Sequence, residues 1–157
     1  MRTASAMKVP YVSFCALRDQ EEIVRESLSV LLPLAEKEEI CILMKTVGIF
    51  ADTSRLRTLM DSYACDELAA LWDMHHPFRD FKETPDQTIR NLGGYVKHVH
   101  LRDSNDDLSY NLIGEGTLPV REMMNALSSI DYNGFISLEW KTEWMPDIPD
   151  REIIYSS

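Results

Sequence analysis

The sequence contains no apolar run close to the roughly 20 residues that a membrane-spanning helix requires, and we expect no secretory signal peptide. It also lacks an excess of basic residues, because the formal net charge is −10. That charge argues against a nucleic-acid backbone or an anionic membrane as the main partner, but it is compatible with a small anionic ligand in a local basic pocket. We therefore expect a cytoplasmic protein with neither a nucleic-acid nor a membrane partner.

Cysteine is scarce as well. Cys15, Cys41 and Cys65 are odd in number and show no spacing typical of a metal site. This pattern predicts reduced, buried thiols, as is usual in the cytosol.

What the chain does have is a regular alternation of strand-like and helix-like segments. Of its 157 residues, 45% are hydrophobic and 27% are charged, which is typical of one globular domain with a real core. Short apolar or β-branched runs predict strands, and apolar residues spaced three and four apart predict helices. The expected strands are residues 9–17, 40–44, 68–72, 95–103 and 135–140, and the expected helices are residues 19–39, 52–60, 84–92 and 118–130.

Five strand–helix units in series predict an α/β fold with a parallel sheet. Repeated units of this kind are typical of the (βα)8 barrel, which needs about 250 residues, so the chain is roughly three units short of a whole barrel. An open doubly wound sheet suits the length better, yet no glycine-rich phosphate loop follows the first expected strand. Length alone favours the open sheet, and motif content favours the barrel.

Polar side chains stand at the ends of four successive expected strands. In chain order they are Lys45, Asp73, His100 and Glu139, and His76 follows three residues after Asp73. The carboxyl ends of parallel strands meet on one rim, where such folds place their sites. Because two carboxylates and an imidazole suit Mn²⁺, Mg²⁺, Co²⁺ or Zn²⁺, Asp73, His100 and Glu139 are the predicted metal ligands.

Each of these residues also has an ordinary structural interpretation. His100 can be a hydrogen-bonded core histidine, Asp73 can cap a turn, and Glu139 can belong to a salt bridge on the rim. Lys45 is interpreted as solvated or as paired with Asp73 or Glu139, and a Schiff-base role for this lysine is chemically open.

The expected strand 95–103 carries two histidines two residues apart. Because side chains alternate across a strand, the two imidazoles are expected to point the same way. The two predicted faces are Val96, His98, His100 and Arg102 on one side, and Lys97, Val99, Leu101 and Asp103 on the other.

Four stretches of the sequence together resemble one known family. They read LWDMHHPFRDFKETPDQT (71–88), YVKHVHLRDS (95–104), GEGTLPVREMMNAL (114–127) and GFISLEWKTEW (134–144). In order and spacing they resemble the xylose isomerase-like barrel family, which comprises sugar and sugar-phosphate isomerases and epimerases, with endonuclease IV as a distant relative. The resemblance implies a partial (βα)8 TIM barrel of about five C-terminal βα units with parallel strands. It further implies that residues 1–157 form a single xylose isomerase-like TIM-barrel domain, truncated at its N-terminal side.

The resemblance also implies one divalent metal ion, held by a Glu, an Asp, a His and a Glu from successive strand ends. Asp73, His100 and Glu139 match the last three ligands, and Glu139 would also be the catalytic acid–base residue. In the family the first ligand lies in a Glu-Thr-His-Gly motif, which reads KTVG at 45–48 in this chain. Lys45 therefore stands where the ligand glutamate has been lost, so metal binding is expected to be weak or absent.

A sugar or sugar phosphate is the ligand that the resemblance implies. His76 matches a substrate-contacting histidine of the family. Arg102 and Asp103 are expected to face the sugar, and Glu115 lies on a loop over the site. His98 is interpreted as structural, because the second histidine of the pair matches the metal ligand.

The function predicted on this basis is divalent-metal-dependent isomerisation or epimerisation of a sugar or sugar phosphate, impaired by truncation and by Lys45. The alternative is a non-catalytic remnant or interaction fragment, which would self-associate or bind a missing N-terminal half. An endonuclease IV-like hydrolase is less well supported, because that branch uses more metal ligands and a charge of −10 suits DNA poorly.

Overall fold

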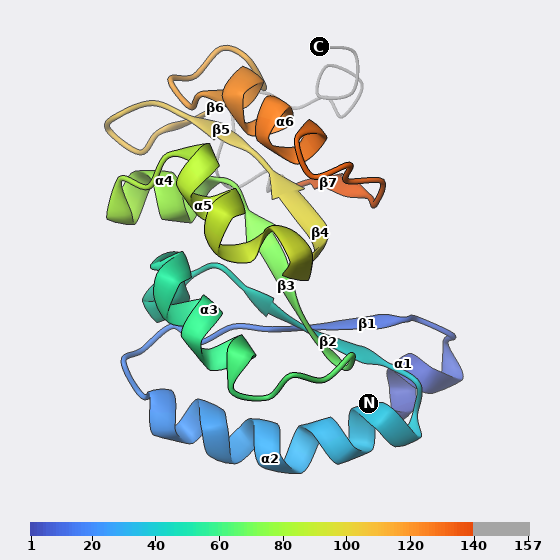
Figure 1. Ribbon diagram of the computed structural model, residues 1–157. Coiled ribbons are helices and arrows are strands. Elements are labelled where there is room, and N and C mark those ends of the chain that lie inside the picture. The colour runs from blue at the N-terminus through green and yellow to red at the C-terminus, as the bar shows by residue number, and fades with distance from the viewer. Residues whose placement is uncertain (140–157) are drawn as a thin grey trace.

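The computed structural model describes residues 1–139 and shows a curved sheet of five parallel strands, with the order β1-β2-β3-β4-β7 (Figure 1). This confirms the predicted fold class, a partial barrel built from about five βα units. Four expected helices are also present. The strands are β1 (Tyr11–Phe14), β2 (Cys41–Lys45), β3 (Leu68–Asp73), β4 (Val96–Leu101) and β7 (Ile136–Leu138), and the four helices are α2 (Glu21–Lys37), α3 (Thr53–Asp61), α5 (Pro85–Leu92) and α6 (Val120–Ser128).

The structure also contains several shorter elements that the sequence does not predict. The segment after β3 lies outside the helices that the sequence predicts, but it forms a helix in which Pro77 occupies the first turn. A proline is tolerated there because the N–H that it lacks would have no partner within the helix. The additional elements are α1 (Arg2–Ala6), α4 (His75–Phe81), the 3-10 turns η1 (Gly48–Ala51) and η2 (Gly93–Tyr95), and the antiparallel hairpin of β5 (Asp103–Ser104) and β6 (Tyr110–Asn111).

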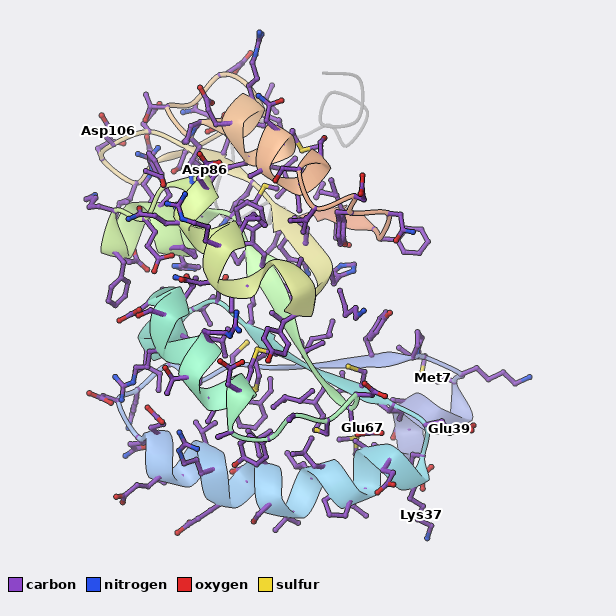
Figure 2. The ribbon with its side chains drawn as sticks, in the orientation of Figure 1. Met7, Lys37, Glu39, Glu67, Asp86 and Asp106 are labelled. Atoms are coloured by element: carbon purple, nitrogen blue, oxygen red, sulfur yellow. The ribbon has the colours of Figure 1, made fainter. Side chains whose placement is uncertain are left out.

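All strands of the sheet begin at one end and finish at the other. In Figure 2, Met7, Glu39 and Glu67 lie together where β1, β2 and β3 begin, and Asp106 lies toward the opposite end, in the β5–β6 hairpin. The carboxyl ends of the strands therefore share one rim, as the barrel architecture requires.

The two faces of the sheet differ in what covers them. The outer face packs against the helices through a large apolar core that includes Met44, Trp72 and Val99. The inner face carries a smaller buried cluster of Leu43, Ala69 and Leu71. Alternation along β2 and β3 produces this division, because successive side chains point to opposite faces, and it sends the last side chains of these strands onto the inner rim.

A bulge between β3 and β4 corrects the predicted faces of the histidine strand. Ala70 pairs with Val96, but the next residue, Leu71, pairs with His98. The extra residue restarts the alternation, so Val96 joins Val99 in the outer core instead of sharing a face with the histidines. The expectation for His98 and His100 is confirmed, since their ring centroids are 5.4 Å apart.

The three cysteines are free, but only part of the prediction about them holds. Cys41 and Cys65 are half-buried, and burial raises the pKa of the Cys41 thiol to about 11. Cys15 is exposed, so its predicted burial is wrong. Within residues 1–139, no helix is both long enough and apolar enough to cross a membrane.

The outer strands β1 and β7 each pair on one side only within the described part of the chain. Large apolar side chains are exposed beside them: Phe135 is 81% exposed and Tyr11 is 37% exposed. Unpaired strand edges with apolar side chains favour association with another chain.

We therefore expect the chain to form dimers or larger species at micromolar concentration, as measured by size-exclusion chromatography with light scattering. Phe135→Lys should shift the population toward monomer, because charge on an edge strand opposes edge pairing. Leu108→Lys is the matched control, since Leu108 is exposed but lies in the β5–β6 hairpin, away from both edges. A monomeric unmodified chain, or equal effects of the two substitutions, would contradict this expectation.

Candidate metal centre

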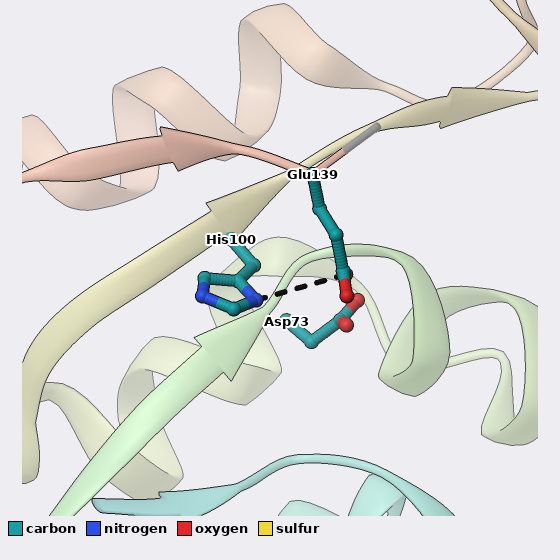
Figure 3. A group of neighbouring side chains, drawn as sticks. All are labelled: Asp73, His100 and Glu139. Carbon is teal, nitrogen blue, oxygen red and sulfur yellow. Dashed lines mark ion pairs between the residues drawn. The ribbon is translucent and has the colours of Figure 1, made fainter. Parts of the chain in front are cut away.

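The three predicted metal ligands converge at the rim. Asp73 ends β3, His100 lies near the end of β4, and Glu139 directly follows β7. One ligand atom from each residue lies within 4.8 Å of those of the other two, and Figure 3 shows the side chains directed toward one another. The predicted convergence is confirmed, and the structure contains a candidate metal-binding triad.

The position of Asp73 is fixed by its buried strand and by hydrogen bonds with Thr46. All six residues of β3 are buried, so the strand has no freedom to slide its terminal carboxylate to the other face. The hydroxyl of Thr46, after β2, accepts a hydrogen bond of 2.9 Å from the backbone N–H of Asp73 and donates one of 3.2 Å to its carbonyl oxygen. The Asp73 carboxylate is fully buried, so it requires a positive partner or hydrogen-bond donors.

Lys45 supplies one such partner. Its Nζ lies 3.0 Å from Asp73 Oδ2 and 3.1 Å from Glu139 Oε1. The sequence predicted a pairing with one carboxylate or the other, and the structure shows the ammonium paired with both. Lys45 therefore fills the space between the two acidic members of the triad.

Arg102 supplies a second positive charge, which sequence reasoning did not foresee. Its Nη2 lies 3.1 Å from Asp73 Oδ2, and its Nη1 lies 3.3 Å from Glu139 Oε2. The side chain is buried, and its guanidinium also stacks 5.6 Å from the centre of the Tyr110 ring. Contact of Arg102 with a sugar stays a prediction, and in the structure its guanidinium lies on the triad.

These neighbours set the electrostatics of the rim. The pKa of the Glu139 carboxyl lies well below its ordinary value, chiefly through the neighbouring His100 and further through Arg102 and Lys45, whereas burial acts in the opposite direction. His100 Nδ1 and Glu139 Oε2 are 3.6 Å apart. Glu139 therefore carries its negative charge at neutral pH.

His75, which the sequence analysis did not single out, is a buried neighbour of the site. It is only 4% exposed, and neither ring nitrogen has a hydrogen-bond partner in the described part of the chain. Burial lowers its pKa to about 4, and the nearby charges of Arg102 and His76 act in the same direction. His75 is therefore neutral at physiological pH.

Of the predicted sugar contacts, His76 lies at the rim but is already engaged. Its Nδ1 is 2.8 Å from Asp80 Oδ2, and its Nε2 is 2.6 Å from Arg102 Nη2. Its side chain is 28% exposed, so it borders the rim while linking α4 to the charge cluster.

Backbone groups hold the side chain of Asp103, a predicted sugar contact. Its carboxylate is buried and accepts four backbone N–H groups, which belong to Ser104, Gly114, Gly116 and Leu118. A carboxylate has about four lone-pair sites, so none is left for a sugar. Asp103 instead anchors the loop on which the exposed Glu115 lies.

The donor types of the triad suit a divalent ion, but their surroundings do not. The two carboxylates are already neutralised by Lys45 and Arg102, both within 3.3 Å. A divalent ion about 4 Å from one ammonium is opposed by about 8 kcal/mol at an effective dielectric constant of about 20. As arranged here, the residues do not fit the ion unless the cations move away.

A parallel partial barrel with an Asp–His–Glu cluster at the carboxyl ends of its strands defines a class: barrel proteins with a candidate metal site on the rim. The chain belongs to the xylose isomerase-like TIM barrel family, whose family model matches residues 1–155. No curated protein is similar enough to match the sequence.

Solved structures share the fold at low sequence identity. A xylose isomerase domain protein from Planctomyces limnophilus is 17% identical, with a TM-score of 0.75 over 99% of this chain and 60% of that one. A D-allulose 3-epimerase from Methylomonas sp. is 17% identical, with a TM-score of 0.74 over 89% of this chain and 53% of that one. An L-ribulose 3-epimerase is 13% identical, with a TM-score of 0.74 over 96% and 57%. The chain thus spans about 53–60% of the length of these proteins.

Proposed function

We propose that this chain carries the rim of a divalent-metal-dependent sugar or sugar-phosphate isomerase or epimerase. We further propose that Lys45 impairs the metal-dependent activity of the chain. Family membership and the convergence of the triad support the first part. The observation that carries the second part is the position of the Lys45 ammonium, 3.0 Å from Asp73 and 3.1 Å from Glu139.

Lys45 also changes the acid–base chemistry that the rim offers. Two carboxylates on opposite sides of a sugar carbon can remove a proton and return it. In this chain Glu139 is the candidate for one of these carboxylates. Lys45 stands at the position that the family resemblance gives to the other, and its ammonium can donate a proton but cannot accept one. Metal-independent exchange of a carbon-bound proton therefore lacks one of its two bases.

The remaining proposed roles concern the ligand. His76 borders the rim and is the proposed sugar contact, and Glu115 is exposed on the loop that Asp103 anchors. Similar proteins include a D-psicose 3-epimerase solved with D-tagatose, which supports a ketose or its phosphate as the substrate class. Because the chain spans 49% of that epimerase and 53–60% of the other similar proteins, activity also requires the barrel to be completed.

The test is calorimetric titration with Mn²⁺ or Zn²⁺ at neutral pH, together with an epimerase assay on ketoses. We expect the unmodified chain to bind Mn²⁺ poorly and to show no epimerase activity. Lys45→Glu removes the blocking charge and adds a fourth ligand, so metal affinity should rise at least about tenfold, which corresponds to about 1.4 kcal/mol.

Lys97→Glu is the matched control, because it makes the same change of charge at an exposed lysine on β4. It should leave metal affinity unchanged. Tight binding of one ion by the unmodified chain, or no gain in a folded Lys45→Glu variant, would show that Lys45 does not impair the site. Several bound ions would instead favour the hydrolase alternative.

The second candidate function is a non-catalytic interaction fragment. The paired Lys45 favours it, as do the outer positions of β1 and β7 in the sheet that residues 1–139 form. A folded Lys45→Glu variant that binds no metal ion and self-associates would support this alternative.

A further inference from the structure

Two cations, not one, bridge the acidic pair of the triad. Lys45 and Arg102 approach the same atom, Asp73 Oδ2, at 3.0 Å and 3.1 Å. They also share the Glu139 carboxylate, at Oε1 and Oε2 respectively. We call Lys45 and Arg102 the resident cation pair.

Arg102 is held in this position by more than the carboxylates. It is 5% exposed, its Nη2 donates to His76 Nε2 at 2.6 Å, and its guanidinium lies over the Tyr110 ring. A guanidinium is charged at any physiological pH and spans two carboxylates with its fixed fork of donors. It therefore cannot yield its place by losing a proton.

We propose that the resident cation pair as a whole takes the place of the divalent ion, so that Arg102 closes the site independently of Lys45. This inference rests on the proposed function of the rim, and it names a second determinant of that function. Two monovalent cations balance the charges of Asp73 and Glu139, so a divalent ion and the resident cation pair exclude each other.

One consequence separates this proposal from the account of Lys45 alone. In Lys45→Glu a third carboxylate joins the rim while Arg102 stays, and the guanidinium gains an additional anionic partner. The ion must then displace a buried, multiply hydrogen-bonded arginine. Removal of Lys45 should consequently restore only part of the metal affinity.

The experiment compares Mn²⁺ binding by calorimetry in four full-length proteins: the unmodified chain, Lys45→Glu, Arg102→Gln and the double variant. Thermal unfolding of each is recorded in EDTA and in Mn²⁺. We expect the double variant to bind Mn²⁺ at least about tenfold more tightly than Lys45→Glu does, a coupling of ordinary size for residues in contact. Arg102→Gln alone should gain little, because Lys45 remains between the carboxylates. Lys97→Gln, at the exposed lysine on β4, is the control for loss of one positive charge.

The outcomes distinguish the two proposals. If the folded double variant binds Mn²⁺ no more tightly than Lys45→Glu does, the role of Arg102 is overturned and that of Lys45 stands. If the unmodified chain binds one ion tightly, or its midpoint of unfolding rises in Mn²⁺ relative to EDTA, both proposals are overturned.

If the double variant is unfolded in EDTA, folding on addition of Mn²⁺ supports the proposal. If it stays unfolded, Lys45→Glu combined with Arg102→Met decides, since methionine keeps the apolar stem at this position but carries no charge: a gain over Lys45→Glu supports the proposal and no gain overturns it.

Discussion

Asp103→Ala is expected to lower the free energy of unfolding by about 4 kcal/mol, the largest effect that we predict for a single side chain. The substitution leaves four backbone N–H groups without an acceptor, at Ser104, Gly114, Gly116 and Leu118. A buried donor that loses its partner costs about 1–3 kcal/mol, and partial entry of water reduces the sum. Urea denaturation at neutral pH measures the change.

Glu115→Ala is the matched control, because Glu115 lies on the same loop but is exposed. Its effect on stability should stay within about 0.5 kcal/mol. If Asp103→Ala cost no more than this control, the carboxylate would not anchor the loop, and Asp103 would again be available as a sugar contact.

Gly48→Ala is expected to cost about 3 kcal/mol of stability. Gly48 has a φ of 58°, a conformation that strains any residue with a Cβ. A Cβ at this position would also run into the carbonyl oxygen of Ala16 and lie 2.8 Å from Leu17 Cα, and both of these are backbone atoms. The chain cannot relieve such a clash by turning a side chain, so the loop between Lys45 and α3 would have to move away from the end of β1.

Gly94→Ala is the control for this substitution, since an added Cβ there meets nothing within 4 Å. Its effect should lie within about 0.5 kcal/mol of zero. Both variants are compared by chemical denaturation, and Gly48→Ala should also disturb the position of Lys45. Equal stability of the two variants would show that the close approach of Gly48 to β1 is not required.

The rim shows how this chain neutralises a buried acidic pair. A buried acidic pair can be neutralised by a divalent ion or by basic side chains of the chain itself, and here the second solution is built into the fold. The same carboxylates that suit a metal ion therefore also hold β2, β3, β4 and β7 together through ion pairs that span the strands.

The sequence by itself determined the five strands of the sheet, the four longer helices and the line of candidate ligands, because all of these depend on local patterns. The buried run of β3 ends in Asp73, and Thr84 followed by Pro85 begins α5 through a capping box with Gln87. Parallel strands then bring Asp73, His100 and Glu139 to one rim without any further information. The pairing of Lys45 with a carboxylate could be predicted as well, because Lys45 also stands at a strand end on this rim.

Only the tertiary structure decided the features that rest on contacts between distant segments. The bulge opposite Ala70 removed Val96 from the face of the histidines, and strand alternation cannot reveal a register shift. Asp103 became a loop anchor because backbone N–H groups 11 to 15 residues away fold back onto it. Arg102 became the second cation of the triad because its buried guanidinium forms ion pairs with the carboxylates of Asp73 and Glu139. These two carboxylates come together only once β3, β4 and β7 are side by side.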